Sequence, residues 1–110
     1  MPNQELTHVF RALTDPTRRA VVERLIHGPA AVSELARPFK MALPSFVQHL
    51  GVLEDCGLVS SEKRGRVRTY ALAPQPLKAA EHWLLAQRLE WERRLDALDD
   101  FLETLKEQQR

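Results

Sequence analysis

The sequence predicts a mainly α-helical chain that carries one small β-hairpin. Apolar residues recur at helical spacing along most of the chain, and Gly and Pro residues divide these segments. A β-rich stretch with a basic tip, Lys63-Arg64-Gly65-Arg66, directly follows the fourth helical segment. A helix that can enter a DNA groove, followed at once by a cationic β-ribbon, is the layout of a winged helix-turn-helix.

The first two helices are predicted from apolar spacing and from a strong start signal. The first covers about residues 5–13, and the second begins at Asp15-Pro16 and runs to about His27. Asp15 can accept hydrogen bonds from free amide groups at a helix start, and Pro16 suits the first helical position. Gly28-Pro29 ends the second helix. The first helix presents one apolar face, made of Leu6, Val9, Phe10 and Leu13.

A short helix, a turn and a longer helix follow. The short helix covers about residues 32–37, and Pro38 disturbs its last turn. Residues 39–42 form the turn, and the longer helix runs from about Pro44 to Cys56. Gly57 can take the positive φ of a helix C′ residue. The buried side of the longer helix is assigned to Phe46, Val47, Leu50, Val52 and Leu53, although Phe46 and Val47 cannot both point the same way.

Residues 58–63 and 67–72 are predicted to form the hairpin, with Arg64-Gly65-Arg66 between them. Side chains alternate along a strand, so Arg66 and Arg68 share one face with Tyr70, which could pack or bond a phosphate. Residues 73–76, Ala-Pro-Gln-Pro, are expected to break the pattern before the last helix.

The last helix is expected over about residues 77–106. Its apolar residues alternate steps of four and three with one polar interruption at Arg88, which is the seam of a coiled coil. The favoured interpretation is an interface between two copies, because Trp83 and Phe101 add apolar bulk beyond a narrow stripe. The alternative is that the helix packs on its own domain. The expected interface comprises Leu6, Phe10, Leu84, Trp91, Leu95, Leu98 and Leu102.

Length and composition fit a single domain spanning residues 1–110, with residues 5–73 as core and wing and residues 77–106 as dimerisation helix. No apolar run approaches the roughly 20 residues that span a bilayer, so no membrane partner is expected. The N-terminal residues lack the features of a signal peptide. Cys56, the only cysteine, excludes an internal disulfide and fits a reducing cytoplasm.

The distribution of charge favours double-stranded DNA as a partner. The net charge is only +1, but residues 60–72 hold four basic side chains against Glu62. In a helix-turn-helix, residues at the start of the second helix reach base edges, and Gln can bond adenine through two contacts. The alternative is that these side chains are only solvated. The DNA-binding residues predicted from the helix and its preceding turn are Lys40, Leu43, Ser45, Gln48 and His49, and those predicted from the hairpin are Lys63, Arg64, Arg66 and Arg68.

Three segments together resemble the ArsR/SmtB family of bacterial transcriptional regulators. They are ALTDPTRR (12–19), VSELA (32–36) and PSFVQHLGVLEDCGLV (44–59), and the similarity covers nearly the whole chain. The resemblance implies a homodimeric winged helix-turn-helix that pairs through its first and last helices. It also implies repression by operator binding, relieved by an effector or by thiol modification.

The chain departs from the metal-sensing members of that family. Where those members carry a Cys-x-Cys pair, this chain has Ala31-Val32-Ser33, and its last helix has only His82 beside Glu81. Neither arrangement predicts a metal or any other cofactor, although a dimer could pool ligands across its axis. Val47-Gln48-His49 stands where many members have Ser-Lys-His or Ser-Arg-His, and Ala42 replaces a common capping Ser.

The predicted function is therefore a DNA-binding transcriptional regulator, a repressor that acts as a homodimer on a pseudo-palindromic operator. No catalytic residues are predicted, because Ser45 and His49 lie one turn apart without an orienting acid. Cys56 is interpreted as a packed residue, with a redox switch as the alternative. A winged-helix protein-interaction module without sequence-specific DNA binding is the alternative function. The effector is left unknown.

Overall fold

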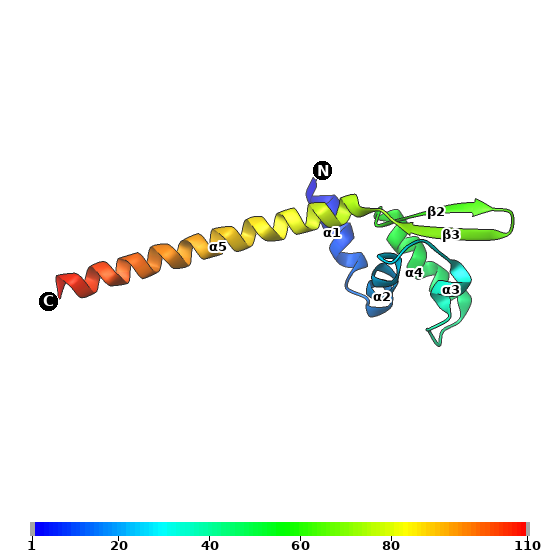
Figure 1. Cartoon of the computed structure of the whole chain (residues 1–110), viewed down its shortest axis with the longest axis horizontal. Helices are drawn as coiled ribbons and strands as arrows, with labels where there is room; N and C mark the ends of the chain where they lie inside the picture. The colour runs from blue at the N-terminus through cyan, green and yellow to red at the C-terminus, as the bar shows by residue number, and fades with distance from the viewer. Residues whose placement is uncertain (1, 110) are drawn as a thin grey trace. The chain divides into compact units, whose positions relative to one another are not determined.

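The computed structural model describes residues 2–109. The elements run in the order α1 (Pro2–Ala12), α2 (Pro16–Leu25), β1 (Ala30–Ala31), α3 (Val32–Ala36), α4 (Leu43–Asp55), β2 (Val59–Arg64), β3 (Val67–Leu72) and α5 (Pro74–Gln108) (Figure 1). The described residues form two compact units, which divide between Ala80 and Glu81. The predicted class, mainly helical with a small hairpin, is confirmed.

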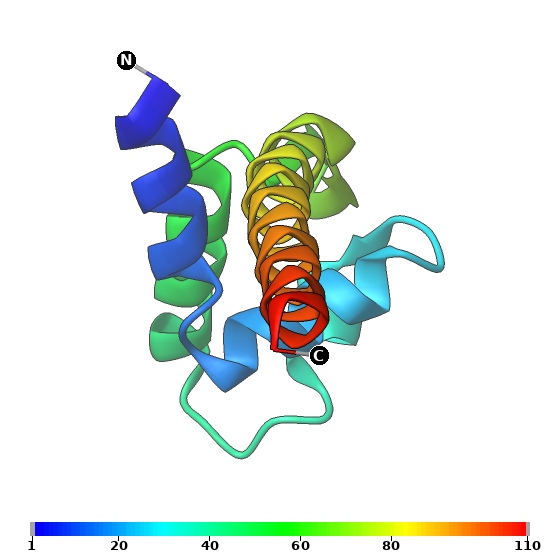
Figure 2. The same cartoon turned by 90° about the vertical axis from the view of Figure 1, so that its left-hand side faces the viewer.

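The core of the first unit is built from helices α1 to α4, the base of the hairpin and the start of α5. Phe46, Leu50 and Leu53 of α4 have no exposed surface, and the ring centroids of Phe39 and Phe46 lie 5.4 Å apart. Helices α1 and α4 lie side by side (Figure 2). Helix α4 is therefore held by the core along one side only, and its other side is exposed. The remaining core residues are Val9, Ala12, Val21, Val22, Leu25, Ala30, Leu35, Leu58, Val59, Tyr70 and Ala80.

Local signals set the ends of α2 and α4 as predicted. The Asp15 carboxylate accepts a hydrogen bond of 3.1 Å from the backbone N–H of Arg18, and Pro16 is the first helical residue. After α4, Gly57 has φ +82°. Its N–H bonds the carbonyl of Glu54, and the N–H of Leu58 bonds the carbonyl of Leu53. This pair of bonds is a Schellman motif, and it turns the chain directly into β2.

The sheet has three antiparallel strands in the order β1-β3-β2. The hairpin was predicted to within one residue. Its loop is Gly65-Arg66, and only Gly65, with φ +64°, has a positive φ. A positive φ at the first loop position alone is the mark of a type II′ turn, whose twist matches that of the flanking strands. The sequence prediction missed β1, which exists only through its pairing with Thr69 and Tyr70 of β3.

Two expectations about helix ends and faces were wrong. Helix α5 starts at Pro74, so residues 74–76 do not break it. Proline is tolerated in a first helical turn because the amide groups there have no partner within the helix. Val47 and Val52 of α4 are 45% and 39% exposed instead of buried, because Phe46, Leu50 and Leu53 already fill the side that faces the core.

Candidate nucleic-acid interface

The exposed side of α4 carries most of the residues that the sequence predicted to reach DNA bases. Leu43, Ser45 and Gln48 all have exposed side chains, as does Lys40 in the preceding turn. Leu43 is the first residue of α4, and Ala42 before it gives no side-chain cap. The free backbone N–H groups of this first turn therefore point outward with the positive end of the helix dipole. The structure thus leaves four of the five predicted helix and turn residues exposed, in the first two turns of α4 or in the turn before it.

His49 lies differently from these four residues. Its side chain is 24% exposed, and an Arg18 Nη1–H donates to its Nδ1 over 3.1 Å. Accepting this bond requires the neutral tautomer with its proton on Nε2. The Asp15 carboxylate lies 3.7 Å from the same nitrogen. One edge of the imidazole is therefore engaged inside the protein and is not free to read a base.

Arg18 is the centre of this contact and was not singled out from the sequence. Its Nε–H donates to the carbonyl of Ala12 over 2.7 Å, and its Nη2 donates to the carbonyl of Arg11 over 3.2 Å. Together with the bond to His49, these contacts join the end of α1, the start of α2 and the middle of α4. The segment Asp15-Pro16-Thr17-Arg18 carried a visible helix-start signal, but nothing in its spacing pointed to residue 49, which is 31 positions away.

Partial burial raises the pKa of Asp15, but four opposing effects are together stronger. The backbone N–H of Arg18, the ring of His49, the guanidinium of Arg18 and the backbone N–H of Thr17 all favour the carboxylate, so the pKa of Asp15 falls below its usual 3.8. Asp15 is therefore charged at neutral pH, where it caps α2 and faces the Arg18–His49 contact.

The wing, residues 59–72, exposes its cations at the tip of the hairpin. Strand pairing places Lys63 opposite Arg68 and Arg64 opposite Val67. Arg64 lies 3.5 Å from Glu62, whereas the side chains of Lys63 and Arg66 make no ion pair within residues 2–109. Both side chains of the Arg64–Glu62 pair are highly exposed, and such a pair contributes little in water. The tip therefore keeps its cationic charge available to a polyanion.

Arg68 connects the wing to α4. Its Nη1 donates to the Ser61 hydroxyl over 2.8 Å, and that hydroxyl lies 3.1 Å from a carboxylate oxygen of Glu54. The guanidinium of Arg68 is exposed but is already hydrogen-bonded inside the protein. Through these contacts Arg68 holds the wing against α4.

Of the two roles expected for Tyr70, packing is confirmed and bonding a phosphate is wrong. Tyr70 is only 5% exposed and belongs to the core, because the face of β3 that it shares with Arg68 turns towards the helices at this point. Burial, followed by the nearby carboxylate of Glu54, raises the pKa of Tyr70 above 10.0. Its hydroxyl therefore stays neutral and serves the fold.

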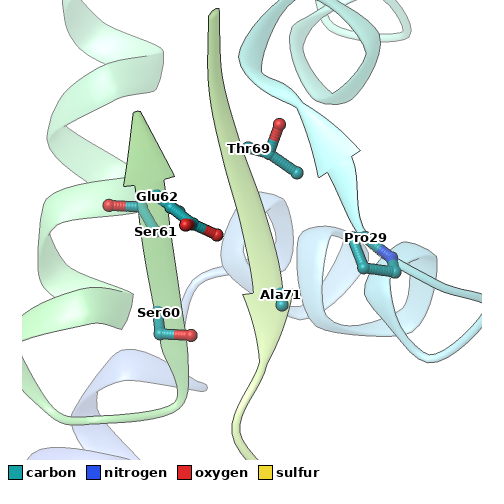
Figure 3. A pocket seen from close by; sticks show the side chains of 6 residues that line it. All are labelled: Pro29, Ser60, Ser61, Glu62, Thr69 and Ala71. Carbon is teal, nitrogen blue, oxygen red and sulfur yellow. The ribbon is translucent and has the colours of Figure 1, made fainter. Parts of the chain in front are cut away.

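The face of the sheet opposite to Tyr70 carries a hollow (Figure 3). The chemistry of its lining differs from that of the cationic wing tip. Its lining is Pro29, Ser60, Ser61, Glu62, Thr69 and Ala71. Its polar side chains are Ser60, Thr69 and Glu62, whereas the Ser61 hydroxyl points to the other face, where it bonds Arg68 and Glu54. No basic side chain lines the hollow, which disfavours a phosphate at this place. The hollow is therefore not part of the candidate nucleic-acid interface.

The residues predicted to form a dimer interface fall into two groups. Leu6 and Phe10 of α1 are half-buried and pack against the core of the first unit. The others lie on α5 in the second unit and are 42% to 63% exposed, and they comprise Leu84, Trp91, Leu95, Leu98 and Leu102. An exposed apolar row of this length is typical of a surface that another molecule covers.

The remaining candidate groups show no metal-binding arrangement among residues 2–109. No group of three or more His, Cys, Asp or Glu side chains is placed to hold a metal ion. Cys56 is half-buried, packs against the core and donates its S–H to the carbonyl of Leu53 over 3.3 Å. None of the helices described is both long and apolar enough to cross a membrane.

Comparison with known proteins places this geometry in a family. Residues 13–62 match the model of a helix-turn-helix domain family. The chain is 50% identical over 70 residues to the HTH-type transcriptional regulator Rv2034 of Mycobacterium tuberculosis, a match that covers 64% of this chain and 65% of that relative. It is 30% identical over 80 residues to the transcriptional repressor SdpR of Bacillus subtilis, covering 73% of this chain and 89% of SdpR.

Two solved structures that resemble this chain are also described as transcriptional regulators. One is an ArsR family transcriptional regulator, RHA00566, at 54% identity and a TM-score of 0.79, covering 82% of this chain and 93% of that one. The other is the homodimeric winged helix-turn-helix DNA-binding domain of Mb0332 from Mycobacterium bovis, at 26% identity and a TM-score of 0.62, covering 82% of each chain. This protein belongs to the ArsR family of winged helix-turn-helix transcriptional regulators.

Proposed function

We propose that the chain is a repressor that binds a pseudo-palindromic operator in double-stranded DNA as a homodimer. One observation carries the proposal: the first compact unit combines an exposed start of α4 with a cationic wing tip whose Lys63 and Arg66 side chains make no ion pair within the described residues. In helix-turn-helix proteins the second helix enters the major groove and its first residues contact base edges. The name of the relative SdpR supports repression.

Residues of α4 and its preceding turn would make the sequence-reading contacts. The side-chain amide of Gln48 can form two hydrogen bonds with adenine, and the hydroxyl of Ser45 can form a hydrogen bond with several bases. Lys40 and the amide groups at Leu43 would contact phosphate. His49 is not in this group of proposed base contacts, because its Nδ1 faces Arg18.

The wing would add sequence-independent affinity. Lys63, Arg64 and Arg66 are exposed at the hairpin tip, where they can reach phosphates or a narrow minor groove. Arg68 would reach the backbone only from its position against Ser61, so its proposed contribution to DNA binding is smaller.

The dimer would be formed by the apolar row of α5 together with α1. Trp91 is 63% exposed and Leu98 is 51% exposed, and both lie on the same seam. The homodimeric state named for the Mb0332 domain supports this assembly. Two copies would then present two α4 helices to two half-sites of one operator.

The proposed reading role of Gln48 is tested by comparing a footprinted operator with random DNA of the same length. We expect Gln48→Ala to weaken operator binding by roughly tenfold per half-site, within the range for a lost bidentate base contact. Binding to random DNA should hardly change. Arg64→Ala is the matched contrast, because it should weaken binding to both duplexes by the same factor.

Equal losses on operator and random DNA for Gln48→Ala would contradict its reading role. The alternative, a protein-interaction module, predicts a different result. In that case neither the wild type nor any variant binds the DNA upstream of its own gene in a salt-dependent way.

A further inference from the structure

Two exposed apolar side chains lie next to each other at the start of α4. Leu43 is 55% exposed and Val47 is 45% exposed. They are four residues apart on one helix, which places their Cβ atoms within about 6 Å of each other. The core side of α4 is already filled by other residues, so neither Leu43 nor Val47 is needed for packing.

The fold offers no reason for apolar residues at these two positions. Valine is a weaker helix former than alanine, and an exposed position provides no packing that would offset this. A single exposed apolar residue would be unremarkable. Here two such residues lie one turn apart at the helix end where helix-turn-helix proteins meet bases. The same unit also carries an exposed cationic wing tip, which suits a polyanionic partner.

DNA has one apolar group in its major groove, which is the C5-methyl group of thymine, and apolar side chains recognise it by contact. We propose that Leu43 and Val47 read thymine methyl groups in each operator half-site. Gln48, which follows Val47 on the same helix, suits adenine, so the three residues together select A·T pairs. This inference rests on the proposed DNA-binding function and specifies its base preference.

The experiment replaces single thymines in the footprinted operator by deoxyuridine, which removes the methyl group and leaves the base-pairing groups unchanged. For the wild-type dimer, one or two positions per half-site should each weaken binding by about fourfold, the value for one buried methyl-sized group. Deoxyuridine elsewhere in the operator should have no effect. The measurement is a fluorescence anisotropy titration at fixed salt.

Protein variants assign the effect to a side chain. Val47→Ala should bind the thymine and deoxyuridine duplexes equally at one of the sensitive positions. Val52→Ala is the matched control, because Val52 is a valine of the same helix that is 39% exposed and lies further from the helix start. This variant should keep the full sensitivity. Circular dichroism checks that both variants are folded.

The outcomes separate this inference from the proposed function. Salt-dependent, footprinted binding with equal affinity for every thymine and deoxyuridine duplex would overturn the methyl-reading proposal and leave the repressor proposal standing. A loss of sensitivity in Val52→Ala equal to that in Val47→Ala would overturn the assignment to Val47. The absence of salt-dependent binding to any upstream duplex would overturn the proposed function itself.

Discussion

Arg18 joins three helices of the first compact unit through a single guanidinium. Its contacts with Ala12, Arg11 and His49 are all part of one local network with the Asp15 carboxylate. The groups in this network are polar and only partly buried, so each of their hydrogen bonds makes a favourable but small contribution to the free energy of unfolding. The network fixes where α2 begins relative to α4, and it accounts for a histidine that turns inward from an otherwise exposed helix face.

At Asp15 we expect the capping interaction to matter for stability. Asp15→Ala should lower the free energy of unfolding by about 1 kcal/mol, the usual cost of losing an N-cap side chain. Asp15→Asn keeps a capping oxygen and should lose clearly less. Urea unfolding followed by circular dichroism measures both, and an alanine variant as stable as the wild type would contradict the capping role.

The charge of Asp15 predicts a pH dependence of stability. The pKa of Asp15 is lower in the folded chain than its usual 3.8, so folding favours the carboxylate. The stability that this charge contributes is complete above the unfolded pKa and is lost as pH falls through the folded pKa. The stability difference between wild type and Asp15→Asn should therefore shrink as the pH is lowered below about 4. A difference that is constant from pH 7 to pH 3 would contradict this assignment.

Helix α5 carries an exposed apolar row that nothing in the described part of its own compact unit covers. Residues 81–108 of this helix present exposed side chains throughout, and the apolar ones recur along one row. Helices that bury no face gain little from tertiary packing, and their intrinsic propensity is a weak source of stability. In the proposed homodimer, a second copy of the same helix would supply a matching apolar row, because a two-fold interface is self-complementary.

Charge placed within this row should separate the dimer. We expect the double variant Leu95→Glu, Leu98→Glu to be monomeric at ten micromolar, because four carboxylates would otherwise be buried at the seam. Ala97→Glu is the matched control, since Ala97 is exposed on the same helix but lies outside the row. Multi-angle light scattering gives the mass. A dimeric double variant, or a monomeric wild type, would contradict the proposed seam.

At the scale of the whole molecule, the spacing of apolar residues and the positions of Gly, Pro and capping residues predicted most of the helices and strands. The Asp15-Pro16 start, the Gly57 turn and the wing followed from local chemistry, and the structure confirms them. Strand β1 could not be predicted, because two alanines carry no strand signal and only their pairing with β3 defines them.

The exposure of side chains in the candidate DNA-binding site could be predicted where it follows from the local sequence. It could not be predicted where it depends on packing against other helices or strands. The wing tip is exposed because nothing at a hairpin tip can cover it. His49 turns inward because Arg18 from α2 meets it, and Tyr70 is buried because helices cover that end of β3. Val47 is exposed because Phe46 fills the core side of α4. Each of these outcomes is set by tertiary contacts that helical or strand periodicity does not contain.

The most direct test of the proposed function is a salt titration of DNA binding. The fluorescence anisotropy of a labelled duplex from the region upstream of the gene gives the affinity at several salt concentrations. It is measured for the wild type and for a wing variant that carries both Arg64→Ala and Arg66→Ala. Lys106→Ala, in the last turn of α5, is a control that removes one positive charge from the second unit.

For the wild type we predict affinity that falls steeply with salt, and for the wing variant we predict weaker binding with a slope reduced by about one unit per lost phosphate contact. The Lys106→Ala control should follow the wild type. Binding that is absent or independent of salt, or a wing variant with an unchanged slope, would contradict the proposal that this chain is a DNA-binding repressor with a cationic wing.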